Sequence, residues 1–238
     1  MIYAVGIGPG ERAQRTAAAE AALQGADVLV GYRTYIDIVM PDYPGKPAFA
    51  TAMMGEVERC REALRLSRQG QNVAVVCSGD AAVYGMAGLL MELADADDCI
   101  EVVPGITAAM SASAVLGAPL AGDMAIISLS DLLTPWDVIE RRLDAAARGD
   151  FCMAIYNPSS KKRADHLCRA VDIVLRWQSP ELPCGWVRNI GRAGQCSKLL
   201  TLGELRQEQV DMFTTVIIGN SATIVKDGRM ITPRGYRK

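Results

Sequence analysis

The chain has 238 residues, which is enough to bury a sizeable core as one large α/β domain or as two smaller ones. Apolar residues make up 50% and charged residues 22%, as in a globular protein, and the net charge of −2 argues against nonspecific binding to nucleic acid or anionic membranes. No apolar run reaches the ~18 residues that span a bilayer, and the N-terminus lacks a basic leader and a signal-like apolar segment. We therefore expect a cytoplasmic protein.

Seven cysteines and one histidine are the residues most suited to metal binding or nucleophilic chemistry. None of the cysteines forms a Cys-x-x-Cys pair, and an odd number in a chain without a leader predicts reduced thiols that pack as small apolar groups. His166 lies in a predicted helix, without partners at the spacing of a zinc site or a Ser-His-Asp triad. We expect it to be structural, and we predict no metal site.

Strands and helices alternate through the first half of the chain. The expected strands are 2–5, 27–31, 73–76 and 100–103, and the expected helices are 16–23, 54–68, 83–91 and 108–116. Prolines and glycine predict a loop over 41–47. This alternation favours a mostly parallel sheet.

The segment 117–122, Gly-Ala-Pro-Leu-Ala-Gly, is the best candidate for a boundary, and it divides the chain into domains 1–118 and 119–238. In the second half we expect strands at 124–127, 151–156, 183–187, 196–202 and 213–218, with helices at 137–147, 161–177 and 205–209. Asp227-Gly228 between two apolar runs predicts a terminal hairpin over 223–232. The second sheet is therefore expected to be mixed.

Polar loops follow strands in both halves, which is where ligands bind in open α/β sheets. Ser78-Gly79-Asp80 directly follows a buried strand, and this stretch alone favours an ordinary strand-turn-helix with Asp80 as the N-cap of the helix. The glycine-rich loop 6–10 is not the G-x-G-x-x-G of dinucleotide-binding proteins, which argues against a nucleotide-binding module without enzymatic activity. Loops of this kind in both halves favour two α/β domains with a cofactor cleft between them.

Three motifs of the first half resemble the tetrapyrrole methyltransferase family: Gly6-Ile7-Gly8-Pro9-Gly10, Ser78-Gly79-Asp80 and Pro104-Gly105-Ile106-Thr107-Ala108. The motifs at 128–136, 156–159, 188–192, 219–221 and 232–236 are similar to those of the precorrin-3B C-17 methyltransferases of corrin biosynthesis. The resemblance runs from residue 2 to residue 236. Each motif alone is a weak signal, whereas the ordered set is specific.

The resemblance implies a homodimeric enzyme of cobalamin biosynthesis that uses S-adenosylmethionine. It would methylate a tetrapyrrole, precorrin-3B or its cobalt form, at C-17 and contract the ring with extrusion of the C-20 carbon. The alternative is another tetrapyrrole methyltransferase that acts at a different ring position. The sequence leaves open whether the substrate contains cobalt.

The resemblance also implies cofactor contacts from both halves, by Pro9, Ser78, Gly79, Asp80, Val83, Thr107, Ala108, Tyr156, Asn157 and Trp186. The chain departs from its relatives at two places. Ala81-Ala82 stand where relatives have Pro-Gly, which removes one rigid φ from the loop. Gly122 stands where relatives often have a histidine, so that histidine has no role here.

Methyl transfer from a sulfonium mainly needs orientation of two reactants and exclusion of water, with a base to remove a proton. Asp131 is the first candidate for this base, and Ser128 and Ser130 are expected to orient the substrate; equally, all three could cap the helix that follows. Positive charge for the substrate carboxylates is expected from Arg188, Arg192 and Arg234. The run Lys161-Lys162-Arg163 at a helix start suits a bound anion or a solvated surface.

Overall fold

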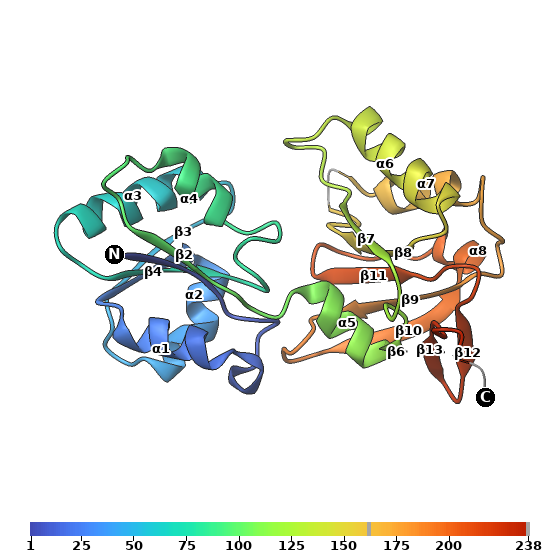
Figure 1. Ribbon diagram of the computed structural model, residues 1–238, viewed down its shortest axis with the longest axis horizontal. Helices are drawn as coiled ribbons and strands as arrows, with labels where there is room; N and C mark the ends of the chain where they lie inside the picture. The colour runs from blue at the N-terminus through green and yellow to red at the C-terminus, as the bar shows by residue number, and fades with distance from the viewer. Residues whose placement is uncertain (161–162, 237–238) are drawn as a thin grey trace. The chain divides into compact units, whose positions relative to one another are not determined.

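The computed structural model describes residues 1–160 and 163–236 and contains two compact units, Met1–Ala108 and Ala109–Lys238. Figure 1 shows both units, which are described separately below. The units divide after Ala108, whereas the sequence predicts a boundary after residue 118. Helix α5 (Ala108–Leu116) is grouped with the second unit because its Leu116 packs closely over Gly185 of that unit's sheet.

The first unit is a parallel sheet of five strands in the order β3-β2-β4-β1-β5. The strands are β1 (Ile2–Gly6), β2 (Val28–Tyr32), β3 (Ala48–Thr51), β4 (Val73–Cys77) and β5 (Ile100–Val103). The helices are η1 (Arg12–Gln14), α1 (Ala17–Gly25), α2 (Arg33–Val39), η2 (Met40–Asp42), α3 (Glu56–Arg68) and α4 (Ala87–Leu93). The expected parallel sheet is confirmed.

Alternate residues of the central strand β4 pack into two different hydrophobic cores, because successive side chains of a strand point to opposite faces of the sheet. Val73 and Val75 pack with α3 and α4, whereas Ala74 and Val76 pack with α1 and α2. Figure 1 shows these helix pairs on the two faces of the sheet. Burial on both faces explains why β4 is an unbroken apolar run.

Four elements of this unit were not predicted, namely η1, α2, η2 and β3, and helix α4 begins later than expected. Helix α2 and the edge strand β3 lie on either side of the proline-rich loop; β3 has four residues, and its pattern is too short to stand out. Helix α4 begins at Ala87 rather than at residue 83. The delay arises because Asp80 holds the backbone N–H groups of Ala82 and Val83 in a loop.

The second unit contains a mixed sheet of five strands in the order β10-β9-β11-β8-β7 and a small sheet in the order β12-β13-β6. In the larger sheet β7 pairs with β8 in parallel, and the other pairs are antiparallel. The strands are β6 (Gly117–Ala118), β7 (Met124–Ser128), β8 (Cys152–Tyr156), β9 (Pro183–Arg188), β10 (Cys196–Thr201), β11 (Thr214–Ile218), β12 (Ile224–Lys226) and β13 (Arg229–Ile231). The mixed sheet and the terminal hairpin match the expectation.

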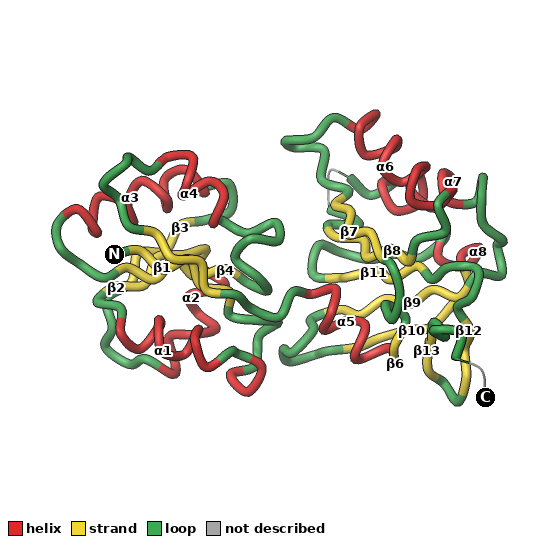
Figure 2. Tube along the Cα trace, in the orientation of Figure 1, coloured by secondary structure: helices red, strands yellow, loops and turns green. Residues whose placement is uncertain are grey.

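Helices α6 (Trp136–Arg148), α7 (His166–Val174) and α8 (Leu202–Leu205) pack on one face of this sheet, and α5 packs on the other (Figure 2). Helix α7 is shorter than the expected 161–177; Lys161 and Lys162 lie outside the described residues. Helix α8 ends where the expected helix 205–209 begins, because a capping box of Thr201 and Glu204 starts it early. Within residues 1–160 and 163–236, every helix is too short or too polar to cross a membrane.

Candidate functional site

The loops after β1 and β4 are joined backbone to backbone at the carboxyl edge of the first sheet. The N–H of Gly8 donates to the carbonyl of Gly79 at 3.0 Å, and the N–H of Gly79 donates to the carbonyl of Gly8 at 2.8 Å. Both glycines have φ of +69°, a conformation that residues with a Cβ rarely adopt. These two glycines therefore let the loops approach each other directly.

The loop after β5 joins the same cluster through Gly105. A Cβ at Gly105 would lie 2.2 Å from the carbonyl oxygen of Gly79 and 2.5 Å from that of Gly6. A Cβ at Gly6 would likewise lie 2.7 Å from the nitrogen of Gly105. The three loops therefore form a glycine cluster, consisting of Gly6, Gly8, Gly79 and Gly105, at the edge where ligands bind in parallel sheets.

Asp80 ties this cluster together through its carboxylate. Oδ1 accepts hydrogen bonds from the N–H groups of Ala82 and Val83, and Oδ2 accepts one from the N–H of Gly105 at 3.0 Å. The alternative in which Asp80 is the N-cap of the next helix is wrong, because the N-cap of α4 is Met86. Asp80 instead fixes the loop after β4 against the loop after β5.

Most of the cofactor residues expected in the first half gather around this edge. Pro9 directly follows Gly8, Ser78 precedes Gly79, and Thr107 lies beside Gly79, with 3.6 Å between its Cα and a Cβ placed there. Ala108 begins α5, and Val83 is held through its N–H by Asp80. Gly105 occurs in a motif but was not predicted as a site residue, because its role depends on loops far away in the sequence.

A second polar cluster lies at the carboxyl ends of β7 and β8 in the other unit. Asn157, with φ of +51°, donates from Nδ2 to the hydroxyl of Ser128 at 2.9 Å. Ser128 Oγ also accepts from the N–H of Ser130, and Ser130 Oγ accepts from Arg163 at 2.6 Å. The expected catalytic serines are therefore linked to Asn157 and to Arg163.

Asp131 lies between two cationic or potentially cationic side chains. Its Oδ1 lies 3.7 Å from Nη1 of Arg163, and its Oδ2 lies 3.7 Å from Nε2 of His166. The alternative in which Ser128, Ser130 or Asp131 caps the next helix is wrong, because the N-cap of α6 is Pro135. The loop after β7 is therefore built around contacts of its own polar side chains.

Tyr156 and Trp186 lie on opposite faces of the second sheet. The hydroxyl of Tyr156 accepts a 2.7 Å hydrogen bond from the N–H of Ala109, which satisfies one donor of the first turn of α5. Trp186 packs against the core beneath α6 and α7, and its indole N–H donates to Glu208 at 3.0 Å. The structure therefore places Trp186 away from Tyr156, although both were predicted as cofactor contacts.

The three arginines expected to bind substrate are not all together. Arg188 ends β9 at the same edge as Asn157 and forms a 2.7 Å ion pair with Asp211, and Arg192 lies in the loop that follows. Arg234 lies two residues after Thr232, whose hydroxyl contacts Cys152 at the opposite end of β8. Arg188 and Arg192 therefore lie at the same edge of the sheet as the polar cluster of the second unit, and Arg234 does not.

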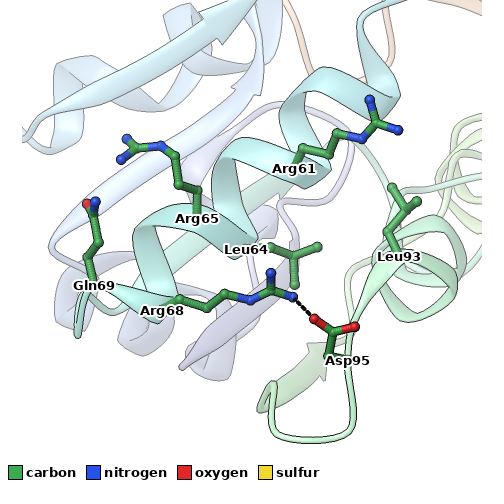
Figure 3. A pocket seen from close by; sticks show the side chains of 7 residues that line it. All are labelled: Arg61, Leu64, Arg65, Arg68, Gln69, Leu93 and Asp95. Atoms are coloured by element: carbon green, nitrogen blue, oxygen red, sulfur yellow. Dashed lines mark hydrogen bonds and ion pairs between the residues drawn. The ribbon is translucent and has the colours of Figure 1, made fainter.

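A surface pocket of about 530 Å³ lies beside α3 in the first unit and is lined by Arg61, Leu64, Arg65, Arg68, Gln69, Leu93 and Asp95 (Figure 3). Arg65 forms a two-point ion pair with Glu62, and Arg68 pairs with both Asp95 and Asp98. These carboxylates already neutralise Arg65 and Arg68, so the pocket is a weak candidate for an anion site.

The Arg68–Asp98 pair predicts a pH-dependent contribution to stability. Hydrogen bonds from Arg68 and from the N–H of Asp95 lower the pKa of Asp98 to about 2. Because the folded pKa is below that of an unfolded aspartate, about 3.9, the contribution is complete above that value and is lost as the pH falls towards about 2. Urea unfolding of wild type and Asp98→Asn should differ at pH 7 and converge near pH 2. Asp97→Asn, in the same exposed loop, is the control; a constant difference for Asp98→Asn across this range would contradict the prediction.

The sequence is similar to a known family over most of its length. A family model described as Tetrapyrrole (Corrin/Porphyrin) Methylases matches residues 1–206. A probable cobalt-factor III C(17)-methyltransferase of Salmonella typhimurium is 47% identical over 239 residues, which cover 99% of this chain and 99% of the relative. The similarity therefore includes both the glycine cluster of the first unit and the polar cluster of the second.

Solved structures agree with this similarity. The crystal structure of the methyltransferase CobJ has a TM-score of 0.91 and 36% identity, over 98% of this chain and 99% of that one. A uroporphyrin-III C-methyl transferase from Thermus thermophilus, solved in complex with S-adenyl homocysteine, has a TM-score of 0.73 and 23% identity, over 92% and 96% of the two chains. At this identity the Thermus structure shows the shared fold alone.

Proposed function

Because this chain belongs to the tetrapyrrole (corrin/porphyrin) methylase family, we propose that it transfers a methyl group from S-adenosylmethionine to C-17 of a corrin precursor, with ring contraction, in cobalamin biosynthesis. The observation that carries the proposal is the 47% identity to a relative with this named activity, over 99% of both chains. The relative's name favours cobalt-factor III as the substrate, with its cobalt ion as part of that substrate; metal-free precorrin-3B is the alternative.

The glycine cluster of the first unit supports the assignment of the cofactor. A carboxylate, two hydroxyls and glycine backbone lie together at the carboxyl edge of a parallel sheet, which suits the hydroxyl and amino groups of an adenosyl amino acid. Ser78, Gly79, Asp80 and Thr107 would hold S-adenosylmethionine there, with Pro9 and Val83 beside it. The bound cofactor supplies a methyl group already activated on a sulfonium, so no metal or covalent nucleophile is needed for its transfer.

The polar cluster of the second unit would act on the substrate. Asp131 has a partly exposed carboxylate and is the proposed proton acceptor, and Ser128 and Ser130 orient the substrate through the network that Arg163 and Asn157 hold. The cationic side chains of Arg188 and Arg192, at the same edge, would bind the carboxylates of the tetrapyrrole. The proposal extends to a homodimer, which rests on the family resemblance, and to a location in the cytoplasm.

Calorimetric titration with S-adenosylhomocysteine tests the cofactor assignment. We expect one site per chain in the wild type and at least about tenfold weaker binding in Asp80→Ala, because three backbone N–H groups that Asp80 holds would lose their acceptor. Asp97→Ala, which removes an exposed carboxylate from the same unit, should bind like the wild type. Absence of binding at millimolar ligand would overturn the cofactor assignment.

The substrate is tested by incubation with S-adenosylmethionine and either cobalt-factor III or precorrin-3B. Mass spectrometry should show the gain of one methyl group, and NMR of the product should place it at C-17. Methylation at another ring position would contradict the proposed regiochemistry while leaving the family assignment intact.

A further inference from the structure

His166 is the one histidine of the chain and lies buried at the first residue of α7, next to the loop that carries Asp131. Its Nδ1 lies 2.8 Å from the carbonyl oxygen of Leu129, and its Nε2 lies 3.7 Å from Oδ2 of Asp131. The ring packs at a tilt against Trp136, with 4.6 Å between centroids. The imidazole is therefore held with Nε2 turned towards the carboxylate.

The contact with Leu129 determines which ring nitrogen carries hydrogen. A backbone carbonyl only accepts hydrogen bonds, so Nδ1 is the donor, and the neutral ring has its lone pair on Nε2. At 3.7 Å the Nε2 lone pair and Oδ2 of Asp131 are beyond hydrogen-bond distance, and the partly exposed carboxylate must move closer for one proton to lie between them. The pair can therefore take up a proton without breaking the bond to Leu129.

Asp131 is the member of the pair that a ligand can reach. Its side chain is 39% exposed, whereas that of His166 is 5% exposed. The other carboxylate oxygen of Asp131 lies 3.7 Å from Nη1 of Arg163. This order is the reverse of that in a hydrolase triad, where the carboxylate is buried behind the imidazole.

We propose that His166 accepts, through Asp131, the proton that the tetrapyrrole loses on methylation; this inference rests on the proposed function. A substrate that has gained a methyl cation equivalent has one positive charge too many, and loss of a proton removes it. Asp131 takes this proton as the substrate's C–H or O–H bond breaks and leaves its electron pair on the macrocycle. The new O–H bond of Asp131 then breaks as an N–H bond forms at Nε2, which restores the carboxylate and leaves an imidazolium.

The charged neighbours of His166 come from three elements. Asp131 and Arg163 lie in the loops before α6 and α7, and Asp165 precedes His166 at the N-cap of α7. Arg169 of α7 stacks on the ring of Trp136 at 3.9 Å and lies 3.8 Å from Asp165. Asp131 is the neighbour whose contact with Nε2 the structure records, so it is the partner for proton transfer.

His166→Asn removes the proposed base but keeps the hydrogen bond to Leu129. Asparagine can still donate to the carbonyl of Leu129 but has no basic atom at the position of Nε2. We expect kcat to fall at least about 100-fold, the usual contribution of a positioned base, while KM and the affinity for S-adenosylhomocysteine change less than about twofold. Asp165→Asn is the matched control on the same turn and should keep wild-type kcat. Wild-type kcat in His166→Asn would overturn the proposal.

His166→Gly with small azoles distinguishes proton transfer from packing. Added imidazole should restore part of the activity, whereas pyrazole, which has the same ring size but is far less basic, should not. Equal rescue by both compounds would show that the ring only fills space. If this variant fails to fold, the kinetics of His166→Asn and the ¹⁵N NMR spectrum described next still test the role of His166.

The ring nitrogens can be observed without any substrate, since an untagged chain has a single histidine. With ¹⁵N-labelled histidine at high pH, we expect hydrogen on Nδ1 and a bare Nε2; the opposite tautomer would overturn the proposal. A wild type that binds no S-adenosylhomocysteine and transfers no methyl group would instead refute the proposed function. An active wild type with an equally active His166→Asn would refute only the role of His166.

Discussion

Replacing Gly105 by alanine is expected to destabilise the first unit by about 3 kcal/mol and to abolish binding of S-adenosylhomocysteine. The new Cβ would lie 2.2 Å from the carbonyl oxygen of Gly79 and 2.5 Å from that of Gly6. One atom is backbone of the loop after β4 and the other is backbone at the end of β1, so these segments must separate from Gly105 to admit the Cβ. Separation would also break the bond from the N–H of Gly105 to Asp80.

Thermal unfolding and calorimetry with S-adenosylhomocysteine measure both effects. Gly88→Ala, in α4, is the control, because a Cβ there meets nothing within 4 Å and alanine favours a helix over glycine. If Gly105→Ala does not fold, Gly79→Ala is the second variant. Its Cβ has room, and strain from φ of +69° should cost only about 1–2 kcal/mol, with weakened ligand binding. A Gly105→Ala protein with wild-type stability and binding would contradict the glycine cluster as the cofactor site.

Asp131→Asn is expected to reduce kcat at least about 100-fold and to leave binding of S-adenosylhomocysteine unchanged. Asparagine has nearly the same shape but cannot take up a proton, and the partly exposed side chain lets water solvate Arg163 in place of the carboxylate. Stability should therefore change little. Methyl transfer is measured as the rate at which product mass appears, with the substrate that the wild type accepts.

Asp137→Asn provides the comparison for this variant. Asp137 lies in the first turn of α6, is 71% exposed, and makes a 3.6 Å contact with Arg141. Its replacement removes the same charge near the same loop and should keep kcat near that of the wild type. Equal kcat in the wild type and Asp131→Asn would show that another group, or water, removes the proton.

The sequence alone was sufficient for the family and for the class of fold. Apolar runs such as Val73–Cys77 are patterns of neighbouring residues, so local patterns predicted the parallel first sheet and the mixed second one. The ordered motifs predicted the tetrapyrrole methylase family, which the similarity over the chain confirms. Elements with little pattern of their own, such as the four-residue strand β3, were missed.

Tertiary structure decided what the individual polar residues contact. Asp80 and Asp131 could each be read as helix caps, because a carboxylate in a loop before a helix has the same local signature whether it caps the helix or not. Only the fold brings Gly105 to Asp80, and His166 to Asp131, across long stretches of chain. Local sequence carries motifs and the propensity of each residue for a helix, strand or loop, which is why the family and the fold class could be predicted. The partner of a polar residue that is distant in the chain depends on the order of the strands in the sheet and on which strand ends meet. The contacts of the polar residues therefore could not be predicted from the sequence.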